Sequence, residues 1–189
     1  MELTQRQLRF LEFVKEQHGE QKRKYTGEPY WHHVYAVAEI VSDYETDGLE
    51  IALGHDLLED TACTYDDLFF FLKNNGYDKE KASFIANGVQ ELTDEFVKEN
   101  YPDKNRKERK QMEAERLGKV SPLAQSVKYA DLIHNMQSIV EEDKDFARIF
   151  SKEKRNLLDQ MRSGNIDLFI KCCHTLQEAF IALKKQKKS

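Results

Sequence analysis

The stretch GHDLLEDT places one histidine and three acids close together in an otherwise apolar segment. His55 and Asp56 offer an imidazole nitrogen and a carboxylate oxygen, a donor pair that suits Mn, Fe, Zn or Mg. Glu59 and Asp60 stand one helical turn further on, where they could orient or deprotonate a metal-bound water. If 48–61 forms one helix, all four polar side chains lie away from its apolar face. An ordinary surface helix gives the same separation, so this stretch alone leaves both interpretations open.

Two adjacent histidines stand in YWHHVYAVAEIV, within a helix predicted over about 30–44. Helical geometry places His33 on the apolar face with Val37 and Val41, whereas His32 points elsewhere. A solitary histidine on an apolar face is more often a packed core residue than a metal ligand. The ligand interpretation therefore depends on other donors converging on His33.

A third group of polar residues stands in VKYADLIHNM. Asp131 and Asn135 are four positions apart and share one helix face, with Lys128 on the same side. Asp131 stands among apolar neighbours, so it is a candidate for a partly buried acid that needs a cation or hydrogen bonds. The alternative is a solvated aspartate on a helix edge. His134 lies off the direction of Asp131 and is interpreted as a structural or supporting residue.

The composition favours an all-α fold, because the 189 residues include only 8 Gly and 3 Pro. We expect a compact multi-helix bundle formed by one domain over 1–184, followed by a basic solvated tail at 185–189. Thr4, Thr64 and Ser121 are predicted N-caps. Periodicity and capping predict helices over about 4–18, 30–44, 48–61, 65–75, 79–92, 104–118, 122–140, 151–162 and 165–184, with 93–103 irregular.

The formal net charge of −5 argues against a general affinity for nucleic acid. Basic residues gather at 21–24 and 104–110, where they could attract a small anionic molecule. For 104–110 a plain exposed helix is the favoured interpretation. No apolar run is long enough to span a membrane, and the three cysteines form no CxxC pair. We therefore expect a cytoplasmic protein that acts away from membranes, and a homo-oligomer is left open.

The order of these segments, H, then HD, then D, each on its own predicted helix, resembles that of the HD-domain metal-dependent phosphohydrolases. RKYTGEPYWHHVYAVAEI, GHDLLEDT and VKYADLIHNM are similar to three signature segments of the hydrolase domain in the Rel/SpoT stringent-response enzymes and in stand-alone small alarmone hydrolases. The resemblance covers roughly residues 20–165, and the ordered combination is more specific than any single segment.

The resemblance implies that His33, His55, Asp56 and Asp131 bind one metal ion, usually Mn²⁺ in this family. The family's histidine stands four positions before a Val-Ala pair, which selects His33 and not His32, the same choice that helical geometry makes. The remaining histidines do not suggest a second metal cluster, so we expect one ion per chain.

The resemblance also implies an activity. Glu59 and Asp60 match an acidic pair that positions and activates the attacking water, and Asn135 matches a substrate-pocket residue. Arg23 and Lys24 match a basic pair near the substrate phosphates. The implied enzyme is a guanosine-3′,5′-bis(diphosphate) 3′-diphosphatase, which removes the 3′-diphosphate of ppGpp or pppGpp to give GDP or GTP and pyrophosphate.

Two departures from the family pattern keep other functions open. Leu132 stands where the family usually has an arginine, and Gly54 stands where it usually has a bulky aliphatic residue. Both could reshape the pocket, so the alternatives include ppApp, the 2′-phosphate of NADPH, nucleoside 5′-phosphates and deoxynucleoside triphosphates as substrates. A nonenzymatic module that only binds a nucleotide is the remaining alternative.

Overall fold

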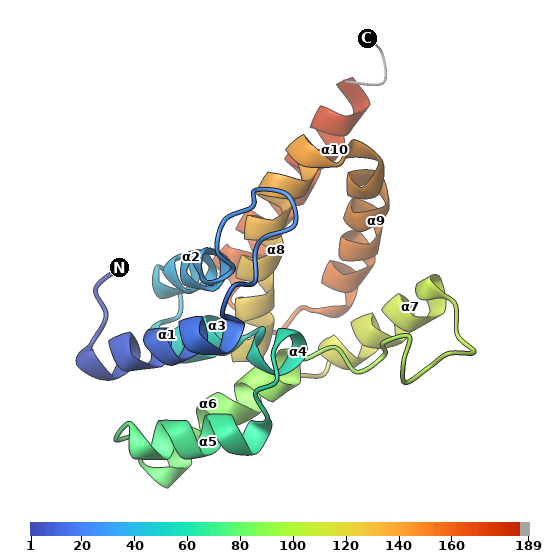
Figure 1. Ribbon diagram of the computed structural model, residues 1–189. Coiled ribbons are helices and arrows are strands. Elements are labelled where there is room, and N and C mark those ends of the chain that lie inside the picture. Colours follow the sequence, from blue (N-terminus) through green and yellow to red (C-terminus); the bar gives the residue numbers. More distant parts are fainter. Residues whose placement is uncertain (186–189) are drawn as a thin grey trace. The chain divides into compact units, whose positions relative to one another are not determined.

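The computed structural model describes residues 1–185 and consists of helices joined by short connections (Figure 1). The elements are α1 (Gln5–His18), α2 (Trp31–Ser42), η1 (Thr46–Gly48), α3 (Leu49–Gly54), α4 (Leu57–Asp60), α5 (Tyr65–Asn74), α6 (Lys79–Leu92), α7 (Arg106–Leu117), α8 (Pro122–Glu142), α9 (Lys144–Gln160) and α10 (Ile166–Lys185). Across residues 1–185 the only β pairing is an isolated bridge between Lys22 and Pro29. The predicted all-α fold class is confirmed. None of the helices in this range is both long and apolar enough to cross a membrane.

The chain divides into two compact units, Met1–Thr93 and Asp94–Ser189. Each unit has its own buried apolar residues, and each is described separately below. The single domain expected over 1–184 stays a prediction. Of the predicted basic tail, Lys185 ends α10, and 186–189 lie outside the described residues.

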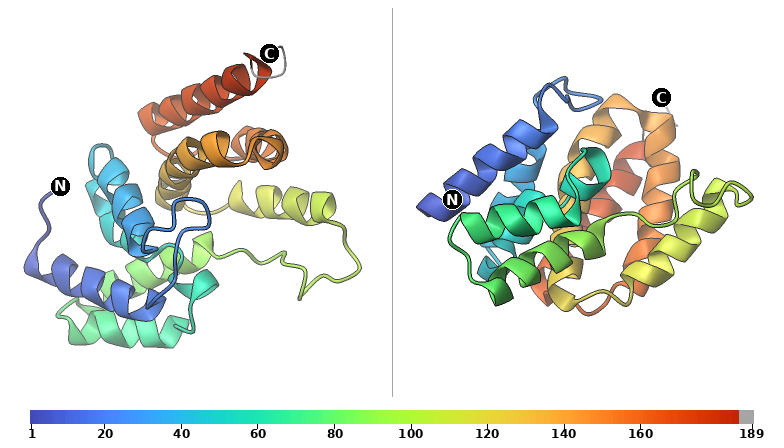
Figure 2. Two further views of the ribbon diagram at one scale, coloured as in Figure 1. Left: turned by 45° about the horizontal axis from the view of Figure 1, so that its top comes forward. Right: turned by 60° about the horizontal axis from the view of Figure 1, so that its bottom comes forward.

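In the first unit, α3 packs against α1, α2 and α6, and α5 lies beside α6 (Figure 2). Phe10, Val37, Leu53 and Ile85 come from four of these helices and are all fully buried. Thr4 and Thr64 start α1 and α5 with capping boxes, in which the threonine hydroxyl accepts a hydrogen bond from a backbone N–H three residues later. Both predicted caps are confirmed. Helices on three sides therefore hold α3 and the residues that follow it.

The prediction of one continuous helix over 48–61 is wrong. The chain breaks after α3 at His55 and Asp56, and α4 begins only at Leu57. Asp56 has φ −103° and ψ 0°, in the sparsely populated bridge region of backbone space. His55, with φ −58° and ψ −29°, continues the helical backbone of α3, whose six residues are all buried, and it is itself 2% exposed. The predicted place of His55 on a polar face is therefore wrong. The break separates this buried histidine from the exposed acids of α4.

In the second unit, α8 packs against α9 and α10, and α7 packs against α9 (Figure 1). Ser121 caps α8 and Pro122 occupies its first position, as predicted. The predicted start of α9 at 151 is wrong, because Asp143 accepts a hydrogen bond from the Phe146 N–H and caps the helix earlier. α7 is not a fully solvated helix, since Ala114 on one of its faces is buried.

Candidate metal centre

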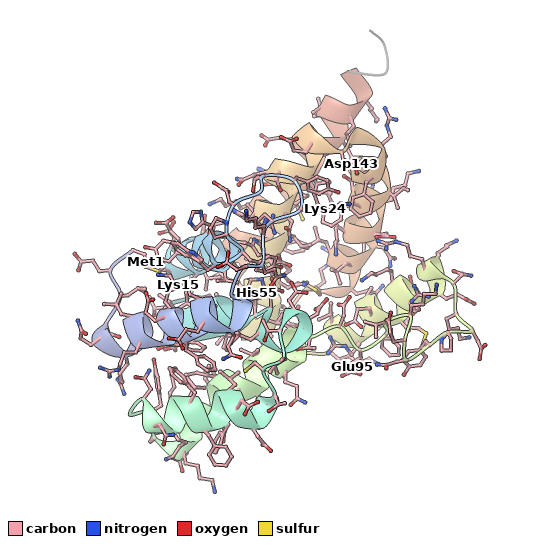
Figure 3. All side chains as sticks on the ribbon, viewed as in Figure 1. Met1, Lys15, Lys24, His55, Glu95 and Asp143 are labelled. Carbon is pink, nitrogen blue, oxygen red and sulfur yellow. The ribbon has the colours of Figure 1, made fainter. Side chains whose placement is uncertain are left out.

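His33 and His55 bring two imidazole rings together in the core of the first unit. The two residues are 1% and 2% exposed, their ring centroids are 5.1 Å apart, and a ring nitrogen of each lies within 4.8 Å of the other. The Nε2 atoms lie 3.5 Å (His33) and 3.0 Å (His55) from Oδ2 of Asp56. Figure 3 labels His55 at the end of α3. His33 is buried, as helical geometry predicts, and His32 is half-buried. The choice of His33 as a metal ligand stays a prediction.

The hydrogen bonding of His55 fixes which of its nitrogens can bind a metal. Nδ1 lies 2.7 Å from the carbonyl oxygen of Ala52, which can only accept, so Nδ1 carries the proton. In the neutral ring Nε2 is then a bare acceptor, and it faces a carboxylate oxygen. Two acceptors at 3.0 Å repel each other unless a proton or a cation lies with them. This donor set fits a divalent ion, and the Ala52 carbonyl orients the ring as outer partners of metal-binding histidines do.

Asp56 is held in its ionised form. Burial alone would raise the pKa of its carboxyl group, but protonated His55 and His33 would hold that pKa well below its usual value, and a bound cation in place of their protons would act in the same direction. Oδ2 also accepts a hydrogen bond of 2.8 Å from the hydroxyl of Tyr30, just ahead of α2. Burial, together with the charges of Asp56 and Asp60, raises the pKa of Tyr30 far above its ordinary value, so the phenol stays protonated and remains a donor. An ionised Asp56 is therefore oriented from outside by Tyr30.

A chain of hydrogen bonds connects Asp60 to α1. Nε2 of Gln21 donates to Oδ2 of Asp60 at 3.2 Å, and Oε1 of Gln21 lies 2.7 Å from Nδ1 of His18. Because a carboxylate only accepts, the Gln21 amide nitrogen faces Asp60, its oxygen faces His18, and Nδ1 of His18 carries the proton. The His18 ring stacks on Tyr30 with centroids 4.8 Å apart. The Tyr30 hydroxyl donates its one proton to Asp56, and the charge of Asp60 is near enough to help raise the pKa of the phenol.

The other predicted residues of the first unit lie at the surface near this network. Glu59 and Asp60 are exposed on α4. Arg23 and Lys24 lie in the loop between α1 and α2, which the Lys22–Pro29 bridge closes (Figure 3). The Arg23 guanidinium lies 5.9 Å from the centre of the Tyr30 ring, and Lys24 is exposed with its ammonium 3.3 Å from the Tyr25 hydroxyl. Glu59 and Asp60 therefore lie on α4, whereas Arg23 and Lys24 lie in the loop before α2. Tyr30 is close to Arg23 of the loop and to Asp60 of α4.

Asp131 and Asn135 belong to α8 in the second unit. Asp131 is 5% exposed, which agrees with the predicted buried acid and not with a solvated one. Its Oδ1 accepts a hydrogen bond of 2.5 Å from Nδ2 of Asn135, and its Oδ2 lies 2.9 Å from the Lys128 ammonium. The predicted sharing of one helix face by these three residues is confirmed.

Reasoning from the sequence did not identify Tyr30, Gln21 or His18 as supporting residues. For Tyr30 a signal exists, because it precedes His33 by three positions and a helical turn brings such residues to one side. The role of Gln21 and His18 could not be predicted from their spacing in the sequence, because it is the turn after α1 that brings them to Asp60.

The fold and the site together define a class of helical proteins with a buried histidine–aspartate metal centre. The HD domain family matches residues 11–159, and the chain belongs to this family. The predicted resemblance is thereby confirmed.

Three curated relatives carry the name guanosine-3′,5′-bis(diphosphate) 3′-pyrophosphohydrolase. The protein of Aquifex aeolicus is 53% identical over 64 residues, which are 32% of this chain and 9% of that protein. The MESH1 protein of Xenopus tropicalis is 32% identical over 132 residues, 67% of this chain and 65% of that one. The MESH1 protein of Drosophila melanogaster is 28% identical over 174 residues, 85% of this chain and 87% of that one. The chain thus spans less than two thirds of the first two relatives.

A solved structure described as a metazoan ortholog of SpoT that hydrolyzes ppGpp has a similar fold. The TM-score is 0.76 at 22% sequence identity, and the match covers 94% of this chain and 97% of that one. The HD fold therefore extends over almost the whole chain.

Proposed function

We propose that the protein is a metal-dependent hydrolase that removes the 3′-diphosphate from ppGpp or pppGpp. The observation that carries this proposal is the pair of buried imidazoles facing an ionised Asp56, with Tyr30 connecting Asp56 to the exposed Asp60. The names of the three relatives support this substrate, because all are guanosine-3′,5′-bis(diphosphate) 3′-pyrophosphohydrolases.

We assign His33, His55, Asp56 and Asp131 as the ligands of one divalent ion per chain, with Mn²⁺ as the ion. The two imidazoles and the ionised Asp56 support the assignment within the first unit, and the burial of Asp131 and its match to the family pattern support the fourth ligand. When bound, the ion would lower the pKa of a water molecule and withdraw charge from the phosphoryl group under attack.

The residues of the chain provide the remaining steps. Glu59 and Asp60 take the proton of the attacking water as its oxygen bonds to the phosphorus attached to the 3′ oxygen. The bond between that phosphorus and the 3′ oxygen breaks, pyrophosphate leaves, and the 3′ oxygen takes up a proton to give GDP or GTP. Arg23 and Lys24 offset the charge of the phosphates, and Asn135 contacts the nucleotide.

The proposed partner is a small nucleotide in the cytoplasm, and neither nucleic acid nor a membrane takes part. The negative net charge of the chain supports this restriction, because a nucleic-acid surface needs an excess of cations.

Product analysis tests the proposed function. The purified chain would be incubated with Mn²⁺ and, separately, with ppGpp, ppApp, NADPH, dGTP and AMP, and the products separated by ion chromatography. We expect GDP and pyrophosphate from ppGpp, and loss of both in Asp60→Asn. Asp66→Asn, which changes an exposed acid on α5, is the matched control and should retain activity. Products from NADPH or AMP alone would replace the proposed substrate, and no product from any nucleotide would favour a binding module.

A further inference from the structure

A small pocket in the second unit is lined by three lysines from three different helices. Lys110 comes from α7, Lys128 from α8 and Lys154 from α9, and Asp94, Glu113 and Glu153 contribute acids to the same walls. The cavity volume is about 20 Å³. A space of this size holds one water molecule or a monatomic ion, because one water-sized probe occupies about 10–15 Å³.

The two glutamates of the pocket are neutralised by arginines and not by the lysines. Both carboxylate oxygens of Glu153 accept hydrogen bonds from Arg106, at 2.8 and 2.9 Å. Glu113 pairs with Arg116 and also accepts hydrogen bonds from the backbone N–H groups that follow Asp94. Arg116 also lies 3.6 Å from the exposed Glu95, so Glu113 shares this arginine, but its backbone donors and the Arg106–Glu153 pair give each glutamate a partner other than a lysine.

Two of the three lysines are paired. The Lys110 ammonium lies 2.6 Å from Oδ2 of Asp94, and the Lys128 ammonium lies 2.9 Å from Oδ2 of Asp131. Burial would raise the pKa of Asp94, but Lys128 and Lys110 hold it below its usual value, so Asp94 is ionised. Two carboxylates thus face three ammonium groups.

Lys154 supplies the uncompensated charge. Within the part of the chain that the structure describes, its ammonium makes no ion pair within 4.0 Å, and it lies 4.9 Å from the centre of the Phe150 ring. Burial, followed by the charges of Lys128 and Lys110, lowers the pKa of Lys154 to about 8. At pH 7 the group is still largely protonated, and a partly buried charge of this kind is costly unless a counter-charge accompanies it.

We propose that Lys110, Lys128 and Lys154 form a binding site for one small anion. The anion is either a free inorganic ion of the size of chloride or a single negatively charged oxygen of a phosphoryl group. This site goes beyond the proposed hydrolase function, and it concerns the second unit alone.

Thermal unfolding of the full chain, without metal or nucleotide, tests the site. The midpoint would be measured at pH 7 and constant ionic strength while sodium gluconate, which serves as a bulky reference anion without a phosphoryl group, is replaced by chloride or by phosphate. We expect the midpoint to rise by about 3–6 °C when the anion exceeds its Kd tenfold. A rise with both anions identifies a free inorganic ion, and a rise with phosphate alone identifies phosphoryl oxygen as the ligand.

Lys154→Met removes the uncompensated charge, so its midpoint in gluconate should exceed that of the wild type and should not respond to either anion. Lys152→Met changes an exposed lysine on the same helix and should respond as the wild type does. Lys154→Gln serves as a second variant if the methionine variant does not fold. An identical response of all chains to chloride and phosphate, or no response of the wild type to either, would overturn the proposal.

Discussion

At the scale of single residues, the metal centre depends on which nitrogen and oxygen atoms carry protons. The Ala52 carbonyl holds the proton of His55 on Nδ1, so Nε2 is free of it and faces Asp56. The Tyr30 phenol cannot ionise near neutral pH, so it stays a donor to Asp56. These outer contacts prepare the donor atoms before any ion binds.

The two adjacent histidines of α2 provide a first test. His33→Ala removes a buried donor beside Asp56, whereas His32→Ala changes a half-buried ring that packs edge-on against Trp31. We expect His33→Ala to weaken Mn²⁺ binding by more than the roughly 10–100-fold that the loss of an outer partner costs. Isothermal titration with Mn²⁺ measures both variants. Retention of the ion by His33→Ala and its loss from His32→Ala would show that the register of α2 is assigned to the wrong histidine.

Tyr30→Phe tests the coupling between the two acids. The variant keeps the ring that stacks on His18 but removes the hydroxyl that donates to Asp56 and interacts with Asp60. We expect Mn²⁺ affinity and kcat each to fall by about 10–100-fold, as for other outer partners of metal ligands. Tyr35→Phe, on the same helix, is the control and should leave both unchanged. Wild-type values of both quantities in Tyr30→Phe would mean that the hydroxyl only fills space.

At the scale of elements, the helix starts that are predicted correctly are those at which a residue in the sequence can cap the helix. Thr4, Thr64 and Ser121 each accept a backbone hydrogen bond at a helix start, as predicted. The break at Asp56, between α3 and α4, has no such capping signal in the sequence. Helical geometry selects His33 over His32 and the family resemblance supplies the predicted ligand set, but neither predicts the burial of His55 or the partners of Asp60.

Gly54, which departs from the family pattern, tests how tightly α3 is held. A Cβ atom at this position would lie 3.1 Å from Cζ of Phe10 and 3.1 Å from Cγ2 of Val89, closer than ordinary van der Waals contact. We expect Gly54→Val to lower the free energy of unfolding by about 1–3 kcal/mol, measured by urea denaturation. In a Phe10→Leu background, where Cζ is absent, the loss should be smaller by at least about 0.5 kcal/mol. An equal loss in both backgrounds would exclude the Phe10 contact as the cause.

At the scale of the whole molecule, charge is divided unequally between the two units. Met1–Thr93 contains 9 basic and 18 acidic residues, whereas Asp94–Ser189 contains 20 basic and 16 acidic residues. A cation is therefore favoured by the first unit, which holds His33, His55 and Asp56, and an anion by the second. The proposed substrate carries several phosphates, so within the acidic first unit Arg23, Lys24 and a bound cation would have to offset that charge.

The pH dependence of stability tests the electrostatic cost that Lys154 brings to the folded chain. The ordinary pKa of a lysine is 10.5, and that of Lys154 in the folded chain is about 8. It is lowered because burial and the nearby charges of Lys128 and Lys110 outweigh the attraction of Asp131 and Asp94. Between these two pH values the unfolded chain binds more protons than the folded chain, so the contribution of Lys154 becomes less unfavourable as pH rises.

In gluconate at pH 7 we expect the free energy of unfolding of Lys154→Met to be higher than that of the wild type by roughly 1–2 kcal/mol. This range is smaller than the full pKa shift implies, because the Lys154 side chain is partly exposed and solvent screens its charge. The difference should shrink between pH 8 and pH 10.5, because the wild type loses its buried charge there while the variant has none to lose. Urea denaturation at four or five pH values across this range measures it, with Lys152→Met as the control that should follow the wild type. A difference that stays constant with pH would mean that the methionine acts through packing, and that Lys154 is not the charged group that the anion neutralises.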